Sequence, residues 1–397
     1  MRISTKSLQL QWLADVYRRQ ADLARIQKQA SSGQRISTAA DDPAGASQIV
    51  SLRQGLDRLQ NYGANAEAAR RRLSLEENAL DKFGDAVNRV RELAVESGGG
   101  IQSNETRTAI ATEMRELMAN MVDIANSQDG EGHYLFAGNE VASQPVTMLN
   151  DVASYNGDDG ARAQRIGDTR TIREGDPGSD VFFSIRNGNG TYFVQDALSN
   201  QGTAFFTSAT VTDAASWVPD NYTITFSPAD TFTVTDSLGN PIASGAWNPG
   251  DAVSFRGIAV TVDGQPATGD SFSVRPSINR SIFATVNRMI TFQEGDTVTP
   301  QGKADFQNVL NATLLNLDQA ERHLSDVRSS VGARLAALDE QKSNNEELSL
   351  QLETTLSSVR DVDYPKTISE LQTQLTSLEA AQKVFAQTRS LSLFDLL

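Results

Sequence analysis

Heptad patterns occupy both ends of this chain, and a different composition fills the middle. Residues 1–140 and 303–397 carry apolar side chains at steps of three and four, the spacing of coiled-coil helices. Residues 141–302 hold 16 of the 28 glycines and 9 of the 11 prolines. A chain that leaves as a helix, builds a separate module and returns as a helix brings its ends together. The sequence therefore predicts a mainly α protein: a long antiparallel coiled-coil bundle formed by both termini, with an inserted β domain.

Helix start and stop signals divide the first arm. A helix is expected over about 5–30, ending at Gly33, because glycine can adopt the left-handed cap conformation. Asp41-Asp42-Pro43 starts the next helix, since aspartate caps a helix and proline suits its first position. An almost unbroken apolar seam then runs over 44–96, and a further helix is predicted over 104–127.

The second arm returns as one long helix and a shorter last one. Apolar positions keep to one face from near Lys303 to about Val362, where Asp363-Tyr364-Pro365 breaks the helix. The last segment follows a regular heptad and ends in an apolar tail. It has little to pack on except the thin helix over 5–30, so its remaining apolar surface is expected to bind copies of the same molecule.

These terminal apolar residues form our candidate assembly and chaperone interface. On the first helix they are Leu10, Leu13, Tyr17 and Leu23, and on the last helix and tail they are Ile368, Leu371, Leu375, Leu378, Phe385, Leu391, Leu393 and Phe394. Each such side chain gains roughly 1.5–3 kcal/mol when fully buried. That free energy would drive assembly.

The middle region has the pattern of short antiparallel strands. β-branched and aromatic residues alternate over 222–226, 231–235, 253–255, 259–262 and 271–274. Turn residues such as Asp263-Gly264 separate these runs. Several short strands at regular spacing predict a sandwich or barrel-like domain. No strand is assigned over 175–215.

Charge and composition exclude several classes of partner. The formal net charge is −15 and the pI is near 4.7, whereas a nucleic acid or an anionic membrane needs a basic surface. The chain has no cysteine, which removes disulfides and thiolate metal sites. No run approaches the roughly 18 apolar residues of a membrane span. The first residues lack the apolar core of a signal peptide, so the protein is expected to be cytoplasmic or exported without a cleaved signal.

Catalytic and metal-binding patterns are missing from the sequence. The two histidines, His133 and His323, lie far apart and form no metal-ligand pair. No nucleophile-elbow or phosphate-binding motif is present. Asp158-Asp159 precedes a glycine and is interpreted as a turn, because the spaced ligands of a calcium loop are lacking. We therefore expect no enzyme activity, no cofactor and no metal.

Three motifs in the helical arms resemble the flagellin superfamily. They are Ser-Ser-Gly-Gln-Arg-Ile at 31–36, Asp-Asp-Pro-Ala-Gly at 41–45 and Arg-Glu-Leu-Ala-Val at 91–95. The start Met-Arg-Ile-Ser-Thr and the segment 132–138, Gly-His-Tyr-Leu-Phe-Ala-Gly, are more similar to the hook-associated protein 3 branch than to filament flagellin. Residues 266–274 are similar to the end of hook-associated modules. The resemblance covers both arms, about three-fifths of the chain.

The resemblance implies a structural subunit of the bacterial flagellum at the junction between hook and filament. Such a subunit is exported unfolded through the flagellar type III channel, without a cleaved signal, and assembles outside the cell as a ring of copies. Its implied neighbours are the first hook-associated protein on the hook side and flagellin on the filament side. Separately, the apolar stripe of the C-terminal helix is expected to need an export chaperone before assembly.

The resemblance and the helix breaks together suggest three domains. Residues 1–43 with 364–397 would form a terminal helical assembly domain that is disordered in the monomer. Residues 44–140 with 303–363 would form a helical rod, and 141–302 an outer β domain. The acidic, lysine-free middle suits a position that faces solvent.

Two other functions stay open from the sequence. Filament flagellin would share the assembly mechanism, but it predicts long filaments from the pure protein. A surface adhesin on a helical stalk is a function of another class. It predicts a soluble trimeric coiled coil and saturable sugar binding by 141–302, whose Phe and Trp residues would form the glycan-binding face.

Overall fold

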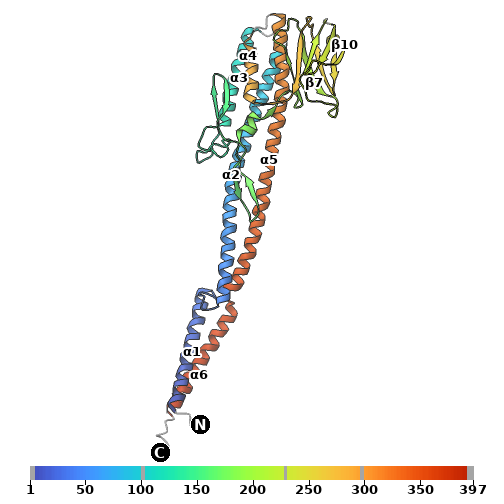
Figure 1. Cartoon of the computed structure of the whole chain (residues 1–397). Coiled ribbons are helices and arrows are strands. Elements are labelled where there is room, and N and C mark those ends of the chain that lie inside the picture. Colours follow the sequence, from blue (N-terminus) through green and yellow to red (C-terminus); the bar gives the residue numbers. More distant parts are fainter. Residues whose placement is uncertain (1–4, 100–102, 228–229, 296–298, 391–397) are drawn as a thin grey trace, which may run out of the picture. The chain divides into compact units, whose positions relative to one another are not determined.

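The computed structural model describes residues 5–99, 103–227, 230–295 and 299–390 (Figure 1). The chain divides into two compact units. Unit 1 comprises residues 1–64 and 340–397, and unit 2 comprises residues 65–339. Helices α2 (Pro43–Gly98) and α5 (Pro300–Arg360) contribute residues to both units. The predicted class, mainly α with an inserted antiparallel β domain, is confirmed.

Unit 1 contains the two terminal helices. Helix α1 (Thr5–Ser32) runs beside α6 (Tyr364–Ser390) in the opposite direction, as Figure 1 shows. Helix α1 ends immediately before Gly33, whose φ of +69° is the predicted left-handed cap. The start of α2 and the end of α5 complete the unit.

Four helices form the core of unit 2. Helices α3 (Asn104–Ala125) and α4 (Ile282–Gln293) pack together and join α2 and α5 in one hydrophobic cluster. Ser103 caps α3, because its hydroxyl accepts a hydrogen bond from the Thr106 amide at 3.2 Å. Ion pairs link α2 to α5, including Arg328 to Glu77 at 2.7 Å.

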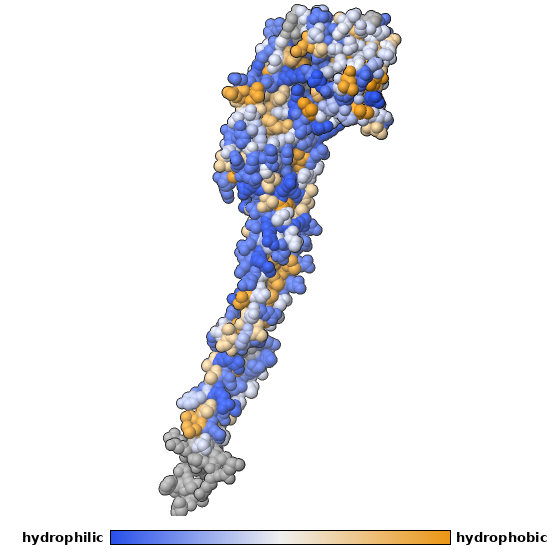
Figure 2. All heavy atoms as spheres, in the orientation of Figure 1, coloured by the Kyte–Doolittle hydropathy of each residue, from blue (hydrophilic) through white to orange (hydrophobic). Residues whose placement is uncertain are grey.

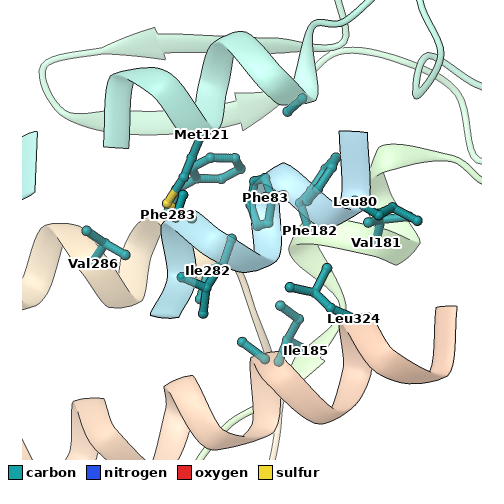
Figure 3. Close-up of a cluster of buried hydrophobic side chains, with 14 of the residues drawn as sticks. Leu80, Phe83, Met121, Val181, Phe182, Ile185, Ile282, Phe283, Val286 and Leu324 are labelled. Atoms are coloured by element: carbon teal, nitrogen blue, oxygen red, sulfur yellow. The ribbon is translucent and has the colours of Figure 1, made fainter. Parts of the chain in front are cut away.

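Aromatic residues from the middle of the chain complete this helical core. Phe182 lies in a short π-helical turn, η1 (Ser179–Phe183), with its ring centroid 4.5 Å from that of Phe83 and 4.9 Å from that of Phe136. Figure 3 shows side chains of α2, α3, η1, α4 and α5 converging at this point. Phe283 of α4 packs edge-on against Phe83 at 6.1 Å.

The helical core therefore extends into the segment that the sequence assigned to an outer β domain. Helix α4 was not expected, and many residues between 141 and 302 are buried in the helical cluster. They are Val146, Ile166, Ile172, Val181, Phe182, Ile185, Ile282, Phe283, Val286, Met289 and Ile290. The physical boundary of the β module is thus narrower than 141–302.

Three short β pairs line this core. They are β1 (Val146–Leu149) with β2 (Val152–Tyr155), β3 (Ala163–Arg165) with β4 (Thr171–Arg173), and β5 (Ile185–Arg186) with β14 (Asn279–Arg280). The last pair joins the segments that lead into and out of the β module. Each pair is antiparallel.

The β module is an antiparallel sandwich with a core of its own. One sheet has the order β10-β9-β8-β13-β6 and the other the order β11-β12-β7. The strands are β6 (Tyr192–Asp196), β7 (Phe205–Val211), β8 (Tyr222–Phe226), β9 (Thr231–Thr235), β10 (Pro241–Ala246), β11 (Ala252–Phe255), β12 (Ile258–Asp263) and β13 (Ser271–Pro276). Residues of both sheets share one buried cluster. Among the described strands the two sheets form no closed barrel. All five predicted strands are present.

The chain enters and leaves the sandwich on two adjacent strands, and asparagines of α5 hold the sandwich against this helix. Tyr192 pairs with Pro276 on adjacent strands. Asn308, which is 2% exposed, accepts a hydrogen bond from the Phe206 amide at 2.9 Å, and Asn311 donates to the Phe206 carbonyl at 2.7 Å. Asn316 accepts from the Gly188 amide at 2.7 Å. Side-chain amides of α5 thus satisfy backbone groups of the edge strand β7 and of the turn before β6, which would otherwise be buried without a hydrogen-bond partner.

Buried charges hold the 128–138 segment against α2. Arg72, 8% exposed, donates to the carbonyl oxygens of Tyr134 (2.7 Å) and Leu135 (3.2 Å) and pairs with Asp129 at 3.1 Å. One turn further on, Glu76 is 1% exposed. Its Oε1 accepts from the Asp176 amide at 3.1 Å, while Oε2 has no hydrogen-bond partner among the described residues.

Burial, reinforced by the charge of Asp176, raises the pKa of Glu76 to about 8, although Arg334 and Arg72 oppose the shift. A folded-state pKa above the unfolded one means that Glu76 favours folding at low pH and loses this contribution as pH rises through about 8. The limiting slope for one group is about 1.4 kcal/mol per pH unit.

We predict that Glu76→Gln flattens the pH dependence of unfolding between pH 5 and 8. The free energy of unfolding of the parent, measured in urea, should fall more over this interval than that of the variant. Glu116→Gln, an exposed site on α3, controls for the loss of one negative charge. Parallel curves for the parent and Glu76→Gln would contradict the prediction.

Candidate assembly interface

The paired helices α1 and α6 bring together most of the predicted interface residues that the structure describes. Leu23, Leu371 and Leu378 are half-buried. Leu10 and Tyr17 remain 61% and 62% exposed, although they belong to the same stripe. The pair therefore shields only part of its own apolar surface.

The other predicted interface residues of these two helices that the structure describes are also exposed. Leu13 is 39%, Ile368 48% and Leu375 40% exposed. Hydrophobic patches on the described part of these helices are visible among polar residues in Figure 2. Leu391, Leu393 and Phe394 lie outside the described residues, as does the side chain of Phe385. An exposed row of apolar side chains on a helix pair is the surface expected of an interface.

A paired break joins these helices to the start of α2 and the end of α5. The Arg35 amide donates to the carbonyl oxygen of Arg360 at 2.6 Å, and the Val362 amide donates to that of Gly33 at 3.0 Å. Gln34 and Asp361 form the antiparallel bridge between them. The two interruptions of the helical arms are thus hydrogen-bonded to each other.

The Arg35 side chain strengthens this link. Its Nη2 donates to the Val359 carbonyl at 2.7 Å, at the C-terminal end of α5, where carbonyl groups lack helical partners. Its Nη1 lies 3.7 Å from Asp42, a longer ion pair. Arg35 therefore contacts both the last turn of α5 and the residue that caps α2.

Two aspartates shape the turn that leads into α2. Asp41 Oδ2 accepts hydrogen bonds from the amides and hydroxyls of Ser37 and Thr38 at 2.8–3.1 Å. These bonds, led by that of the Thr38 amide, lower the pKa of Asp41 to about 2, so the turn is stabilised while this carboxylate is ionised. Asp42 is the predicted N-cap, because its Oδ1 accepts from the Gly45 amide at 3.0 Å.

Ile36 anchors the break in a small core. It is 4% exposed and clusters with Ile49 and Leu356, which are also buried. A Cβ at Gly45 would lie 2.4 Å from Ile36 Cδ1 and 2.7 Å from Asp42 Oδ2, so a larger residue here would displace these side chains. The Ser-Ser-Gly-Gln-Arg-Ile and Asp-Asp-Pro-Ala-Gly motifs thus meet at a single packing contact.

Sequence reasoning treated 31–45 as a helix stop and a helix start, and both assignments are confirmed. It did not identify Arg35 and Ile36 as the residues that join this turn to α5. Their position in the Ser-Ser-Gly-Gln-Arg-Ile motif could have indicated this role. An isoleucine in an otherwise polar link between two helices suggests that its side chain is buried against another part of the fold.

We predict that Ile36→Ala loosens the break without unfolding unit 2. Removing a buried isoleucine side chain costs about 2 kcal/mol or more. Hydrogen exchange of the Arg35 and Ile36 amides, which both bond to Arg360, should accelerate accordingly. Val50→Ala, at a 55% exposed site on α2, is the matched control. Equal exchange rates in the two variants would show that the small core does not hold the break.

The residues considered for chemistry have structural roles. His323 Nε2 lies 2.8 Å from the Asp180 carbonyl oxygen. Asp158 Oδ1 accepts from the amides of Asn139 and Gly160, both at 2.8 Å, as expected of a turn. Within the described ranges no group of three or more His, Cys, Asp or Glu residues could hold a metal ion. In the same ranges no helix is both long and apolar enough to cross a membrane.

Comparison with known proteins decides the family. The model of the bacterial flagellin N-terminal helical region matches residues 3–141, and that of the C-terminal helical region matches 314–397. The solved flagellar hook-associated protein 3 of Legionella pneumophila is 33% identical, with a TM-score of 0.75 over 78% of this chain and 98% of that chain. The chain belongs to the hook-associated protein 3 family. The flagellin-superfamily resemblance is confirmed.

Two further relatives support membership of the hook-associated protein 3 family over the length of the chain. Xanthomonas campestris FlgL is 35% identical, with a TM-score of 0.72 over 77% of this chain and 99% of that chain. Hook-associated protein 3 of Salmonella typhimurium is 24% identical and aligns with 100% of this chain and 99% of its own length. A D2-like domain of flagellar hook-associated protein 1 matches residues 195–276, which is the β sandwich. As a hook-associated protein 3, the chain is a structural protein of the flagellar hook–filament junction.

Proposed function

We propose that copies of this chain form a ring between hook and filament, held together by the helix pair α1–α6. The observation that supports this is the exposed apolar row on the pair, which includes Leu10, Tyr17 and Ile368. Burial of such side chains between copies supplies the free energy of assembly.

The proposal includes specific neighbours. A junction subunit meets hook components on one side and filament components on the other, and we propose the first hook-associated protein and flagellin as these partners. The assembled protein would be extracellular and would have no enzymatic role. Its relatives are structural flagellar proteins.

Before assembly the apolar row needs protection. We propose that an export chaperone covers the C-terminal helix around Leu375 and Leu378, since a groove that accepts an amphipathic helix is a common way to shield one. A chain without cysteine is suited to export in an unfolded state, because no disulfide can form on the way.

We predict that Leu378→Asp and Leu375→Asp abolish both chaperone capture and incorporation at the junction. An aspartate in a buried helix contact leaves a charge without a partner. Gln372→Asp, at an exposed polar site on the same helix, should retain both activities. Co-purification with the chaperone and immunoblots of isolated hook–filament particles measure the two effects. Normal incorporation of the leucine variants would refute this role of α6.

We also propose that α1 and α6 fold only on assembly, as the sequence suggested for the terminal domain. The paired break at Gly33 and Val362 would then mark the limit of order in the monomer. In dilute monomer, amides of α1 and α6 should exchange at nearly the rate of an unfolded chain, while amides of α2 beyond Ile49 stay protected. Strong protection of α1 and α6 in the monomer would contradict this proposal.

A further inference from the structure

A small cavity of about 30 Å³ lies where the β sandwich meets α4 and α5 in unit 2. It has room for about two water-sized groups, so it fits one small ligand and not a peptide. Strands β6, β7 and β14, helices α4 and α5, and the turn before β6 all contribute to its wall. Its apolar lining comes from Phe193, Val194, Phe206, Ala312 and Leu315.

The described residues that line this cavity include two arginines and no carboxylate. Arg280 of β14 and Arg288 of α4 are both half-buried. Within the described part of the chain, no hydrogen bond or ion pair reaches either guanidinium group. Arg288 lies 5.9 Å from the Phe292 ring centroid, near the outer limit of a cation–π contact. Two like charges are thus partly withdrawn from water without a counter-ion, which is unfavourable.

The surrounding charges do not neutralise the pair. Burial and the charge of Arg288 lower the pKa of Arg280, and no carboxylate of the described residues opposes that shift. Burial, together with the charge of Asp305, raises the pKa of Asp196, although Arg288 opposes this shift. Asp196 therefore offsets part of the Arg288 charge from outside the cavity lining, and Arg280 has no such partner. Because arginine keeps its proton in proteins, an anion is needed to relieve the charge.

The asparagines of the lining contribute donors. Asn187 Oδ1 accepts from the Ile278 amide at 2.9 Å, and Asn316 Oδ1 accepts from the Gly188 amide at 2.7 Å. These two residues are 4% and 9% exposed. Their NH₂ groups have no partner among the described residues, so the NH₂ group is what each offers to a ligand. Gln195, the remaining polar side chain of the lining, can also donate.

We propose that this cavity binds a small oxyanion, phosphate-like or carboxylate, between Arg280 and Arg288. Guanidinium groups form paired hydrogen bonds with both kinds of anion. The bound anion would neutralise the two arginines and connect β14 and α4 to the turn before β6. It would thereby tie the sandwich to the helices that carry it. This role is separate from assembly through α1–α6 and can be measured on the unassembled chain.

Hydrogen exchange of the purified full chain tests the site, with inorganic phosphate as the probe. Phosphate should slow exchange of the Gly188 and Phe206 amides, which bond to Asn316 and Asn308 of α5, relative to chloride at equal ionic strength. Calorimetric titration gives the Kd. At ten times the Kd, exchange that requires release of the anion should slow about tenfold. Acetate replaces phosphate in a second series, and a response to only one of the two supports the site and identifies the kind of oxyanion.

Arg280→Gln and Arg288→Gln should each lose the response to the anion. Both variants should fold, since neither guanidinium has an ion pair to lose, and circular dichroism checks this. Arg275→Gln, which removes an exposed arginine of β13, is the matched control and should keep the full response.

Three results would overturn the inference. The first is a parent chain whose exchange neither phosphate nor acetate slows. The second is a glutamine variant at Arg280 or Arg288 that responds as strongly as the parent. The third is loss of the response in Arg275→Gln, because the anion would then act through general surface charge and not through the cavity.

Discussion

The burial of Phe182 and Phe283 among the helices is the interaction on which unit 2 depends. These rings come from the segment between the helical arms, yet they pack against Phe83 in the C-terminal half of α2. Without them the inner face of α2 would lose its aromatic contacts, which contribute beyond their buried area. Within unit 2 the helical arms and the flanks of the insertion consequently form one core, and the sandwich has a separate one.

The sandwich is held on α5 by side-chain hydrogen bonds in addition to apolar contacts with Ala312 and Leu315. Asn308, Asn311 and Asn316 bond to backbone atoms of Phe206 and Gly188. Hydrogen bonds to backbone groups depend on strand geometry more than on the identity of sandwich side chains.

The helices and strands were predicted correctly where the apolar residues follow a single regular spacing. The long helices follow from the apolar steps of three and four, and the strands between 222 and 274 follow from alternation. Helix α4 was not predicted, because its segment is short and rich in Ile, Phe, Val and Thr, which are also typical of strands. The link between Arg35 and Arg360 could not be predicted from pattern, since its acceptor is a backbone carbonyl that any residue provides. The terminal apolar stripe was identified correctly as a pattern, and its role in assembly stays a prediction.

The paired break has a mechanical consequence for a component of a rotating organelle. If only one of the two helical arms were interrupted, the connection at that level would depend on a single link. Here both arms are interrupted at the same level, and Gly33, Arg35, Ile36, Arg360 and Val362 connect them by several backbone hydrogen bonds. Because these hydrogen bonds bridge the two interruptions side by side, separating the arms at this level requires breaking all of them.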